Sequence, residues 1–125
     1  MTYPIVESYG STVTARLSPG HTVRRVLVMC VIDLSPFDDL LGIEIIGFKE
    51  QLGQVPPVGN PTSGETDSDN VIPRWSYHPK GDAFYLQLKK ERAPKQREVL
   101  GLASFDRDGA VVCLQVDIAG DSHLD

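Results

Sequence analysis

Apolar and polar residues alternate along two stretches of the chain, residues 12–17 and 84–88. Successive side chains of a β-strand point to opposite faces, so strict alternation indicates a strand with one buried face. The apolar positions are Val13, Ala15 and Leu17 in the first stretch and Phe84, Leu86 and Leu88 in the second. The pattern therefore predicts two half-buried strands, one in each half of the chain.

A polar loop and then a largely apolar run follow each alternating stretch. The runs cover residues 26–32 and 99–105. A short run without alternation predicts a central strand that is covered on both faces. Each run is followed by a turn that opens with an aspartate, Asp33 or Asp106. The second turn is shorter by about two residues and contains an Asp-Gly pair ending at Gly109, which is typical of a tight hairpin.

A third strand after each turn alternates again. Its apolar positions are Leu41, Ile43 and Ile45 in the first copy and Val112, Leu114 and Val116 in the second. The same order of strand types thus occurs twice, in residues 9–47 and 77–120, and predicts an internal repeat. One three-stranded meander leaves its apolar face open to water, and a second copy covers it. We expect a mainly β fold in which two antiparallel three-stranded meanders pack about a pseudo-twofold axis, as a sandwich or a partly closed barrel.

The segment between the two copies is rich in Pro, Gly, Ser, Thr and acidic residues. Such a composition buries too little apolar surface to offset the cost of ordering the chain, so residues 54–70 are predicted to form a flexible linker. Before it, residues 48–52 predict one helical turn that Gly53 ends. Residues 121–125 are expected to fray. Residues 1–125, with this linker, are expected to form a single domain.

Net charge and cysteine usage narrow the classes of function. The chain has a formal charge of −5 and a pI near 5.1, which disfavours RNA and anionic membranes and favours a basic protein partner. Cys30 and Cys113 lie far apart inside apolar runs, which predicts buried free thiols instead of a zinc site or a disulfide. The start of the chain lacks a signal-peptide pattern, and no apolar run approaches the ~20 residues that cross a bilayer. We therefore expect a cytoplasmic protein.

Short motifs in both copies are similar to one bacterial family. The second copy carries Tyr77, Asp82, Ala83, Asp106, Gly109, Val111 and Val112, and the first carries Tyr9, Gly42, Ile43, Glu44 and Ile45. These positions resemble the bacterial domain of unknown function 2283 family, although the first copy lacks the aspartate-alanine pair and the hairpin glycine of the family pattern. The resemblance implies a β-rich fold without an established activity. Because some members are encoded beside small toxin-like proteins, it also points to an antitoxin-like or immunity-like role.

Glu44 is the first candidate for a ligand-binding residue. It lies between Ile43 and Ile45 on an apolar strand, where a buried and unpaired carboxylate is costly. A ligand-binding carboxylate or a general base explains this placement, and so does an outward-facing position on a half-exposed strand. His78, which precedes the second alternating strand, is the second candidate for ligand binding. No spacing of histidines, aspartates or cysteines is typical of a metal site, and no motif indicates a catalytic residue or a cofactor.

Basic and aromatic residues in the second copy are candidates for contact with a partner. The basic residues are Lys89, Lys90, Arg92, Lys95 and Arg97, and the aromatic residues are Trp75 and Tyr77. The basic group suits either an anionic partner surface or a solvated loop whose charges prevent pairing at a sheet edge. Trp75 and Tyr77 alternate along a strand, which suits either core packing or a partner surface.

Two functions are compatible with these features. The first is a non-catalytic protein-binding module, antitoxin-like or immunity-like, in which an acidic β domain occludes a basic partner protein. The second is a small-ligand-binding or enzymatic domain with a pocket between the two copies near Glu44. Free strand edges are also compatible with a homodimer. We favour the binding module, because no catalytic motif supports the alternative.

Overall fold

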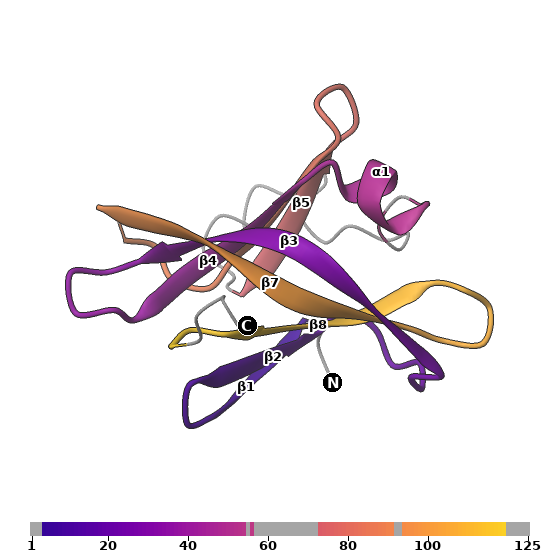
Figure 1. Cartoon of the computed structure of the whole chain (residues 1–125), viewed down its shortest axis with the longest axis horizontal. Coiled ribbons are helices and arrows are strands. Elements are labelled where there is room, and N and C mark those ends of the chain that lie inside the picture. The colour runs from indigo at the N-terminus through magenta and orange to yellow at the C-terminus, as the bar shows by residue number, and fades with distance from the viewer. Residues whose placement is uncertain (1–3, 55, 57–72, 92–93, 120–125) are drawn as a thin grey trace.

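The computed structural model describes residues 4–54, 56, 73–91 and 94–119. In these residues, eight strands form one antiparallel sheet in the order β1-β2-β8-β7-β3-β4-β6-β5, and the sheet curls into a half-barrel (Figure 1). The strands are β1 (Ile5–Tyr9), β2 (Thr12–Arg16), β3 (Arg24–Leu34), β4 (Leu40–Ile46), β5 (Arg74–His78), β6 (Ala83–Gln87), β7 (Lys95–Phe105) and β8 (Val111–Asp117). A short helix, α1 (Phe48–Leu52), follows β4. The prediction of a mainly β, antiparallel fold is confirmed.

The long strands β3 and β7 form the central pair of the sheet. They are antiparallel over their whole length, from Arg24 opposite Phe105 to Leu34 opposite Lys95. On one side of them lies the β5 wing, which consists of β4, β6, β5 and α1. On the other side lies the β1 wing, which consists of β8, β2 and β1 (Figure 1). Each wing therefore combines strands from both halves of the chain.

The two halves of the chain exchange strands, and this exchange is the main difference from two separate meanders. β2 pairs with β8 and β6 pairs with β4, whereas a meander would pair β2 with β3 and β6 with β7. One backbone hydrogen bond occurs at the same place in both halves, just after β2 and just after β6. Leu17 N donates to Val112 O (2.8 Å), and Leu88 N donates to Leu41 O (2.9 Å). The loops that follow are too long for tight hairpins, and they carry the chain across the sheet to β3 and β7.

The two halves of the chain match strand for strand. β3 and β7 have 11 residues each, and β4 and β8 have 7 each with the same order of buried and exposed positions. The buried positions place Val28 in correspondence with Val99, whereas the apolar runs alone aligned Val26 with Val99. That alignment was wrong because the strands begin with exposed residues at Arg24 and Lys95, so the first apolar run starts two residues into β3 and the second starts four residues into β7.

The turns after β3 and β7 have the same geometry. A side-chain oxygen of Ser35 in the first turn, and of Asp106 in the second, accepts hydrogen bonds from two backbone N–H groups at 2.9 to 3.1 Å. Asp38 (φ 68°) and Gly109 (φ 86°) take the left-handed conformation at the same point of each turn. Ser35 is thus the counterpart of Asp106. The prediction that Asp33 opens the first turn is wrong, because Asp33 still belongs to β3.

In the part of the chain that the structure describes, the inner face of the central pair is covered and much of its outer face is open. Val28, Cys30 and Ile32 point to this face and are buried, whereas Leu27 and Met29 point outward and are 62% and 42% exposed. The prediction that the central strands are covered on both faces is therefore wrong. A half-barrel is a single layer, so it encloses a core on its concave side alone.

β1 is an edge strand that the hydrophobic pattern did not indicate. Ile5 and Val6 are adjacent apolar residues, and the three residues that follow them are exposed. An edge strand at the rim of the sheet packs on few neighbours, so its sequence carries no alternation that would reveal it.

Helix α1 inserts an aromatic ring into the core. Phe48 is fully buried, and its ring centroid lies 5.1 Å from that of Phe84. The predicted helical turn is confirmed, and it ends at Gly53 (φ 79°).

The Gln51 amide accepts a hydrogen bond from the backbone N–H of Met29 (2.8 Å) and donates one to its carbonyl (3.2 Å). The same amide donates to the Ile46 carbonyl (3.0 Å), so Gln51 bridges β3 and β4 beyond the point where their ladder ends at Val31 and Glu44.

Two further features complete the core. Cys30 and Cys113 are buried free thiols, as predicted, and burial raises the pKa of Cys30 to about 12.

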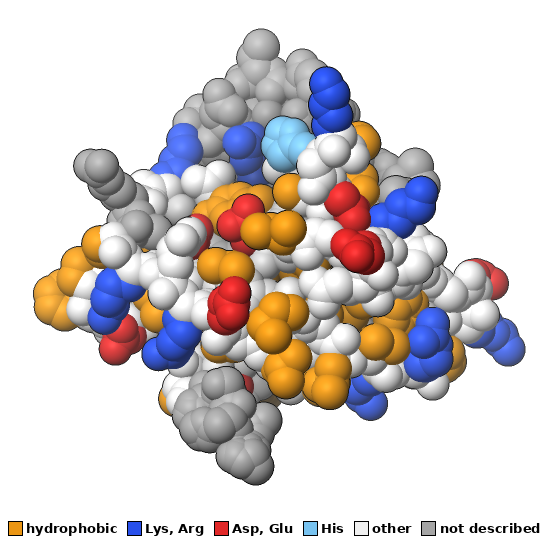
Figure 2. All heavy atoms as spheres, turned by 45° about the horizontal axis from the view of Figure 1, so that its top comes forward, with side chains coloured by type: hydrophobic (Ala, Val, Ile, Leu, Met, Phe, Trp, Pro, Cys, Tyr) orange, Lys and Arg blue, Asp and Glu red, His pale blue; other side chains and the backbone are white. Residues whose placement is uncertain are grey.

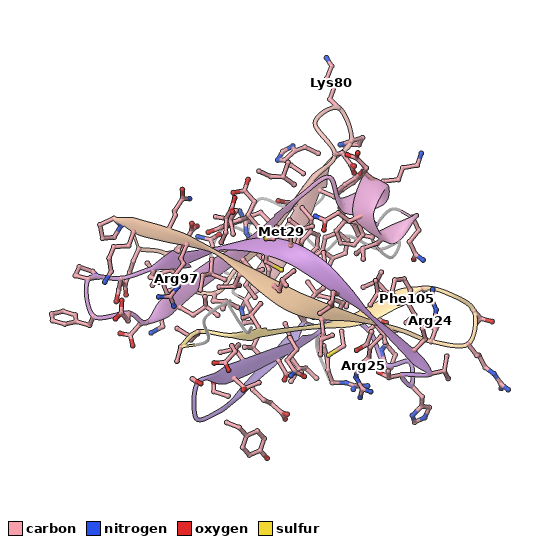
Figure 3. The ribbon with its side chains drawn as sticks, in the orientation of Figure 1. Arg24, Arg25, Met29, Lys80, Arg97 and Phe105 are labelled. Atoms are coloured by element: carbon pink, nitrogen blue, oxygen red, sulfur yellow. The ribbon has the colours of Figure 1, made fainter. Side chains whose placement is uncertain are left out.

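At one end of the central pair, the guanidinium carbon of Arg24 lies 4.2 Å from the ring centroid of Phe105 (Figure 3). This cation–π contact shields the buried ring from solvent.

Most of the predicted linker, residues 54–70, and the predicted frayed tail, residues 121–125, lie outside the described residues. Gln54 is described, and its side-chain amide hydrogen-bonds to the backbone of Gly109 and of Val111.

Asp82 joins α1 to β5 through its carboxylate. The carboxylate accepts hydrogen bonds from the Tyr77 hydroxyl (2.6 Å) and from the backbone N–H groups of Lys49 (2.7 Å) and Glu50 (3.1 Å). These bonds hold the pKa of Asp82 below its ordinary value, and the bond from Tyr77 makes the largest contribution. The same hydrogen bond raises the pKa of Tyr77.

We expect Asp82 to make folding stability depend on pH in acid. A carboxylate whose pKa is lowered on folding stabilises the protein above its ordinary pKa, and this stabilisation is lost as the pH falls through the lowered folded value. Thermal unfolding midpoints of the wild type and Asp82→Asn should differ near neutral pH and converge in strong acid. Asp108→Asn, at the exposed tip of the β7–β8 hairpin, serves as the control. A difference for Asp82→Asn that stays constant into strong acid would contradict this expectation.

Candidate functional site

Four exposed hydrophobic side chains form a group on the outer face of the sheet, which we call the outer strip. They are Leu27 and Met29 on β3, Leu100 on β7 and Ile46 on β4, with exposed fractions between 41% and 62%. Met29 lies directly opposite Leu100 in the β3–β7 ladder. The β3–β4 ladder ends at Val31 and Glu44. Beyond it the Gln51 amide bonds both to the Met29 backbone and to the Ile46 carbonyl, so Ile46 lies across the Gln51 side chain from Met29. Figure 2 shows hydrophobic side chains gathered together, with acidic side chains beside them.

Two carboxylates border the outer strip. Val31 lies opposite Glu98 in the β3–β7 ladder and opposite Glu44 in the β3–β4 ladder. Residues that are directly opposite on neighbouring strands point to the same face, so the two carboxylates flank Val31 on the outer face. In the described part of the chain, neither carboxylate takes part in a salt bridge. The outer strip thus has carboxylates at one end, beside Val31, and the exposed Arg25 at the other end, two residues before Leu27 on the same face of β3.

A buried network at Asp33 continues this border. The Tyr85 hydroxyl (2.9 Å) and the Gln96 side-chain amide (2.8 Å) both donate hydrogen bonds to the Asp33 carboxylate. Burial, and then the bond to Asp33, raise the pKa of Tyr85, so its hydroxyl remains a donor. Gly42 leaves room for this ring, because a Cβ on Gly42 would lie 2.6 Å from Cζ of Tyr85. The network fixes the Tyr85 ring beside Glu44.

The structure does not bring the two predicted ligand-binding residues together. Glu44 is half-buried on β4, opposite Tyr85, and His78 is exposed at the end of β5. β6 lies between these strands. Neither residue lines the pocket described next, and Glu44 belongs to the border of the outer strip.

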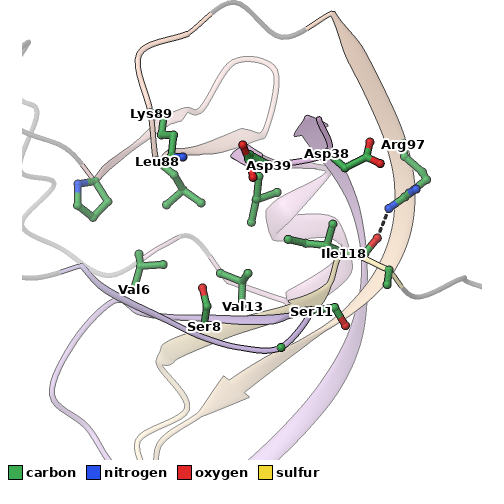
Figure 4. A pocket seen from close by; sticks show the side chains of 14 residues that line it. Val6, Ser8, Ser11, Val13, Asp38, Asp39, Leu88, Lys89, Arg97 and Ile118 are labelled. Atoms are coloured by element: carbon green, nitrogen blue, oxygen red, sulfur yellow. Dashed lines mark hydrogen bonds between the residues drawn. The ribbon is translucent and has the colours of Figure 1, made fainter. Parts of the chain in front are cut away.

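A pocket of about 610 Å³ opens on the concave side, between the wings (Figure 4). Its apolar lining includes Val6, Val13, Leu40, Leu88 and Ile118. Four charged residues also line it, namely Asp38, Asp39, Lys89 and Arg97. The residues come from both halves of the chain. The ligand-binding hypothesis expected a pocket between the two copies, but the residues of this pocket differ from those that were predicted.

The predicted basic group is divided among several places. Lys95 and Arg97 belong to β7 and not to a loop. Lys95 Nζ lies 2.5 Å from Asp38 Oδ1, and the hydrogen bond and charge of Lys95 lower the pKa of the Asp38 carboxyl. Lys89 and Arg97 line the pocket. The other two residues are Lys90, which is exposed after β6, and Arg92, which lies outside the described residues.

Trp75 belongs to the core. It is 4% exposed, and its ring stacks on that of Phe84 with a centroid distance of 5.7 Å. The prediction of Trp75 as a partner-binding residue is therefore wrong, because β5 turns this side chain toward the inner face of the sheet. Tyr77 points to the same face and is partly buried, with its hydroxyl bonded to Asp82.

The outer strip was missed because most of it lies inside the apolar runs. A continuous run does not reveal which of its residues face outward. The available signal was Glu44 in the third strand and Glu98 just before the second run. Charged residues at such positions mark the uncovered face, and Leu27, Met29 and Leu100 share it.

Within the described ranges, no three His, Cys, Asp or Glu side chains are grouped so that they would hold a metal ion. No helix in that part of the chain is both long and apolar enough to cross a membrane. Comparison of the chain with protein-family models, with curated proteins and with solved structures finds no match. Function must therefore be inferred from the outer strip and the pocket themselves.

Proposed function

We propose that this protein is a non-catalytic protein-binding module whose outer strip contacts a basic partner protein. The observation that carries this proposal is the exposed group of Leu27, Met29 and Leu100 on the paired strands β3 and β7, with Ile46 of β4 across the Gln51 amide. Contact with water costs free energy for each of these side chains, and a partner that covers them removes that cost. Exposed apolar groups with a polar border are typical of interaction surfaces.

The acidic border defines the chemistry of the partner. Glu44 and Glu98 lie at the end of the strip that is beside Val31, and the whole chain has a net charge of −5. A partner surface with Lys and Arg beside an apolar centre would be attracted over a distance and oriented on contact. The resemblance of both copies to the bacterial domain of unknown function 2283 family supports an antitoxin-like or immunity-like role in the cytoplasm. Occlusion of a basic protein is one way to perform that role.

Two variants form a matched test of the outer strip. Leu27 and Val23 are 62% and 63% exposed, but only Leu27 belongs to the strip. A photo-crosslinking residue in place of Met29 should capture one protein of net positive charge in the source cells. The affinity of that protein for the purified chain should fall at least ~10-fold for Leu27→Asp and stay unchanged for Val23→Asp.

The charges provide a second test of the same interface. Glu98→Lys should slow association with the captured protein, and the difference from the wild type should shrink as salt is added. Equal losses of affinity for Leu27→Asp and Val23→Asp would reject the outer strip as the interface. If the crosslinker captures a second copy of this chain and sedimentation experiments show a dimer, the outer strip is a homodimer interface and the proposed basic partner is rejected.

A further inference from the structure

The pocket occupies a position that aromatic rings fill in the opposite wing. The ladders of the two outer hairpins show the correspondence, because β1 pairs with β2 as β5 pairs with β6. The corresponding pairs are Val6 and Trp75, Ser8 and Tyr77, and Val13 and Phe84. The residues of the β1 wing are the smaller ones in every pair, and all three line the pocket.

A fourth pair comes from the segments that follow β4 and β8. One backbone hydrogen bond occurs at the same place in both wings: Gly47 N donates to Asp82 O (2.9 Å), and Ile118 N donates to Ser11 O (2.8 Å). The next residue is Phe48 in the β5 wing and Ala119 in the β1 wing. Ala119 also lines the pocket.

In the β5 wing these positions form a packed aromatic cluster. Phe48 lies 5.1 Å from Phe84 and 6.0 Å from Tyr77, and Trp75 lies 5.7 Å from Phe84, measured between ring centroids. The β1 wing has the corresponding backbone but carries two valines, a serine and an alanine at these positions. These smaller side chains line part of the pocket of about 610 Å³. Its volume is in the range of ~300–1,000 Å³ that is typical of small-molecule sites.

The charges around the pocket favour an anionic group. Asp38 is engaged by Lys95 at 2.5 Å, so Lys95 and Arg97 together leave one positive charge in excess on this side of the pocket. Lys89 lies on the opposite side (Figure 4). Arg97 donates to the carbonyl oxygen of Ile118, which holds its guanidinium beside the pocket (Figure 4). A guanidinium has five N–H donors in all, so others remain for a ligand. A carboxylate matches this arrangement because it accepts two parallel hydrogen bonds from a guanidinium.

We propose that the pocket binds a planar aromatic carboxylate. The ring takes the place that corresponds to Phe48, against Ser8, Val13 and Ala119, and the carboxylate lies beside Arg97. This site is on the concave side of the sheet and is separate from the outer strip, so it does not depend on the proposed partner.

Three probes of similar shape test the ligand class with the full chain. We expect 2-naphthoate to bind saturably at one site in isothermal titration calorimetry. Naphthalene-2-methanol and naphthalene-2-methylamine should bind at least ~10-fold more weakly, because they lack the carboxylate that a charge-assisted hydrogen bond requires. Equal binding of the three probes, or no saturable binding of 2-naphthoate at millimolar concentration, would overturn the proposal.

Variants of the chain test the location. Ala119→Phe supplies the missing ring and should abolish binding of 2-naphthoate while the thermal midpoint stays or rises. If Ala119→Phe does not fold, Ser8→Tyr is the second variant that fills the pocket with a ring, and it should likewise abolish binding of 2-naphthoate while the thermal midpoint stays or rises. Arg97→Gln should weaken binding about 10-fold, and Lys80→Gln, at the exposed tip of the β5–β6 hairpin (Figure 3), should not change it. Retained binding in a folded filling variant, or equal effects of Arg97→Gln and Lys80→Gln, would place the ligand elsewhere and overturn the proposal.

Discussion

Phe48→Ala is expected to lower the free energy of unfolding by about 3–5 kcal/mol. The Phe48 side chain is fully buried, and its ring packs against those of Phe84 and Tyr77. Its removal leaves a cavity and also takes away a main contact of α1, in which Leu52 is the other buried residue. Domains of this kind have a total stability of ~5–15 kcal/mol, so the change removes a large part of it.

Equilibrium unfolding in urea measures this loss, with fluorescence of the single tryptophan, Trp75, as a local probe. Phe37→Ala is the matched control, because Phe37 is 86% exposed at the tip of the β3–β4 hairpin. The control should change the free energy of unfolding by no more than ~0.5 kcal/mol. A loss below ~1 kcal/mol for Phe48→Ala would mean that α1 is not docked as the structure describes.

Gly42→Ala is expected to destabilise the fold by about 1–3 kcal/mol, the usual range for an overpacked site. The added methyl group would overlap the Tyr85 hydroxyl and lie 2.6 Å from Cζ of the ring. Tyr85 would have to move, and its hydrogen bond to Asp33 would be lost. Asp33 is only 7% exposed, so its carboxylate would keep Gln96 as its remaining side-chain partner in a poorly solvated place.

A double-mutant cycle isolates this clash. In a Tyr85→Ala background the Gly42→Ala change should cost little, because the ring that it meets is gone. Gly81→Ala is the control for the loss of a glycine, since no other group lies within 4 Å of a Cβ at that position. Equal destabilisation by Gly42→Ala with and without the Tyr85 ring would refute the explanation.

Several elements were predictable because their residues bury one face. The alternation around Val13 and Phe84 correctly indicated β2 and β6, and Gly53 marked the end of α1. The central strands were indicated, but their outer face was misjudged. A strand with one buried face and a strand with two buried faces have the same apolar pattern when hydrophobic residues such as Leu27 and Met29 occupy the exposed face. Arg24 and Lys95 resembled loop residues, although each begins a long strand.

The candidate sites depend on contacts between residues that are far apart in the chain. The pocket joins Val6 and Val13 to Ala119, and none of these small residues indicates a site alone. Their meaning appears only when the two wings are compared position by position, as with Ala119 and Phe48. Trp75 was ambiguous between core and surface, since one alternating strand does not show what covers it. The outer strip required the pairing of Met29 with Leu100, which sequence patterns do not specify.

The exchange of hairpins between the halves has a consequence for synthesis on the ribosome. β1 and β2 are made before the other described strands, but β2 pairs with β8, the last of them. The hairpin of β1 and β2 must therefore wait, with one edge unpaired, until β8 has been made. Pairings between such distant residues slow folding, and unpaired strand edges favour aggregation in the meantime. Until β8 emerges, the nascent chain is thus expected to be a substrate for chaperones.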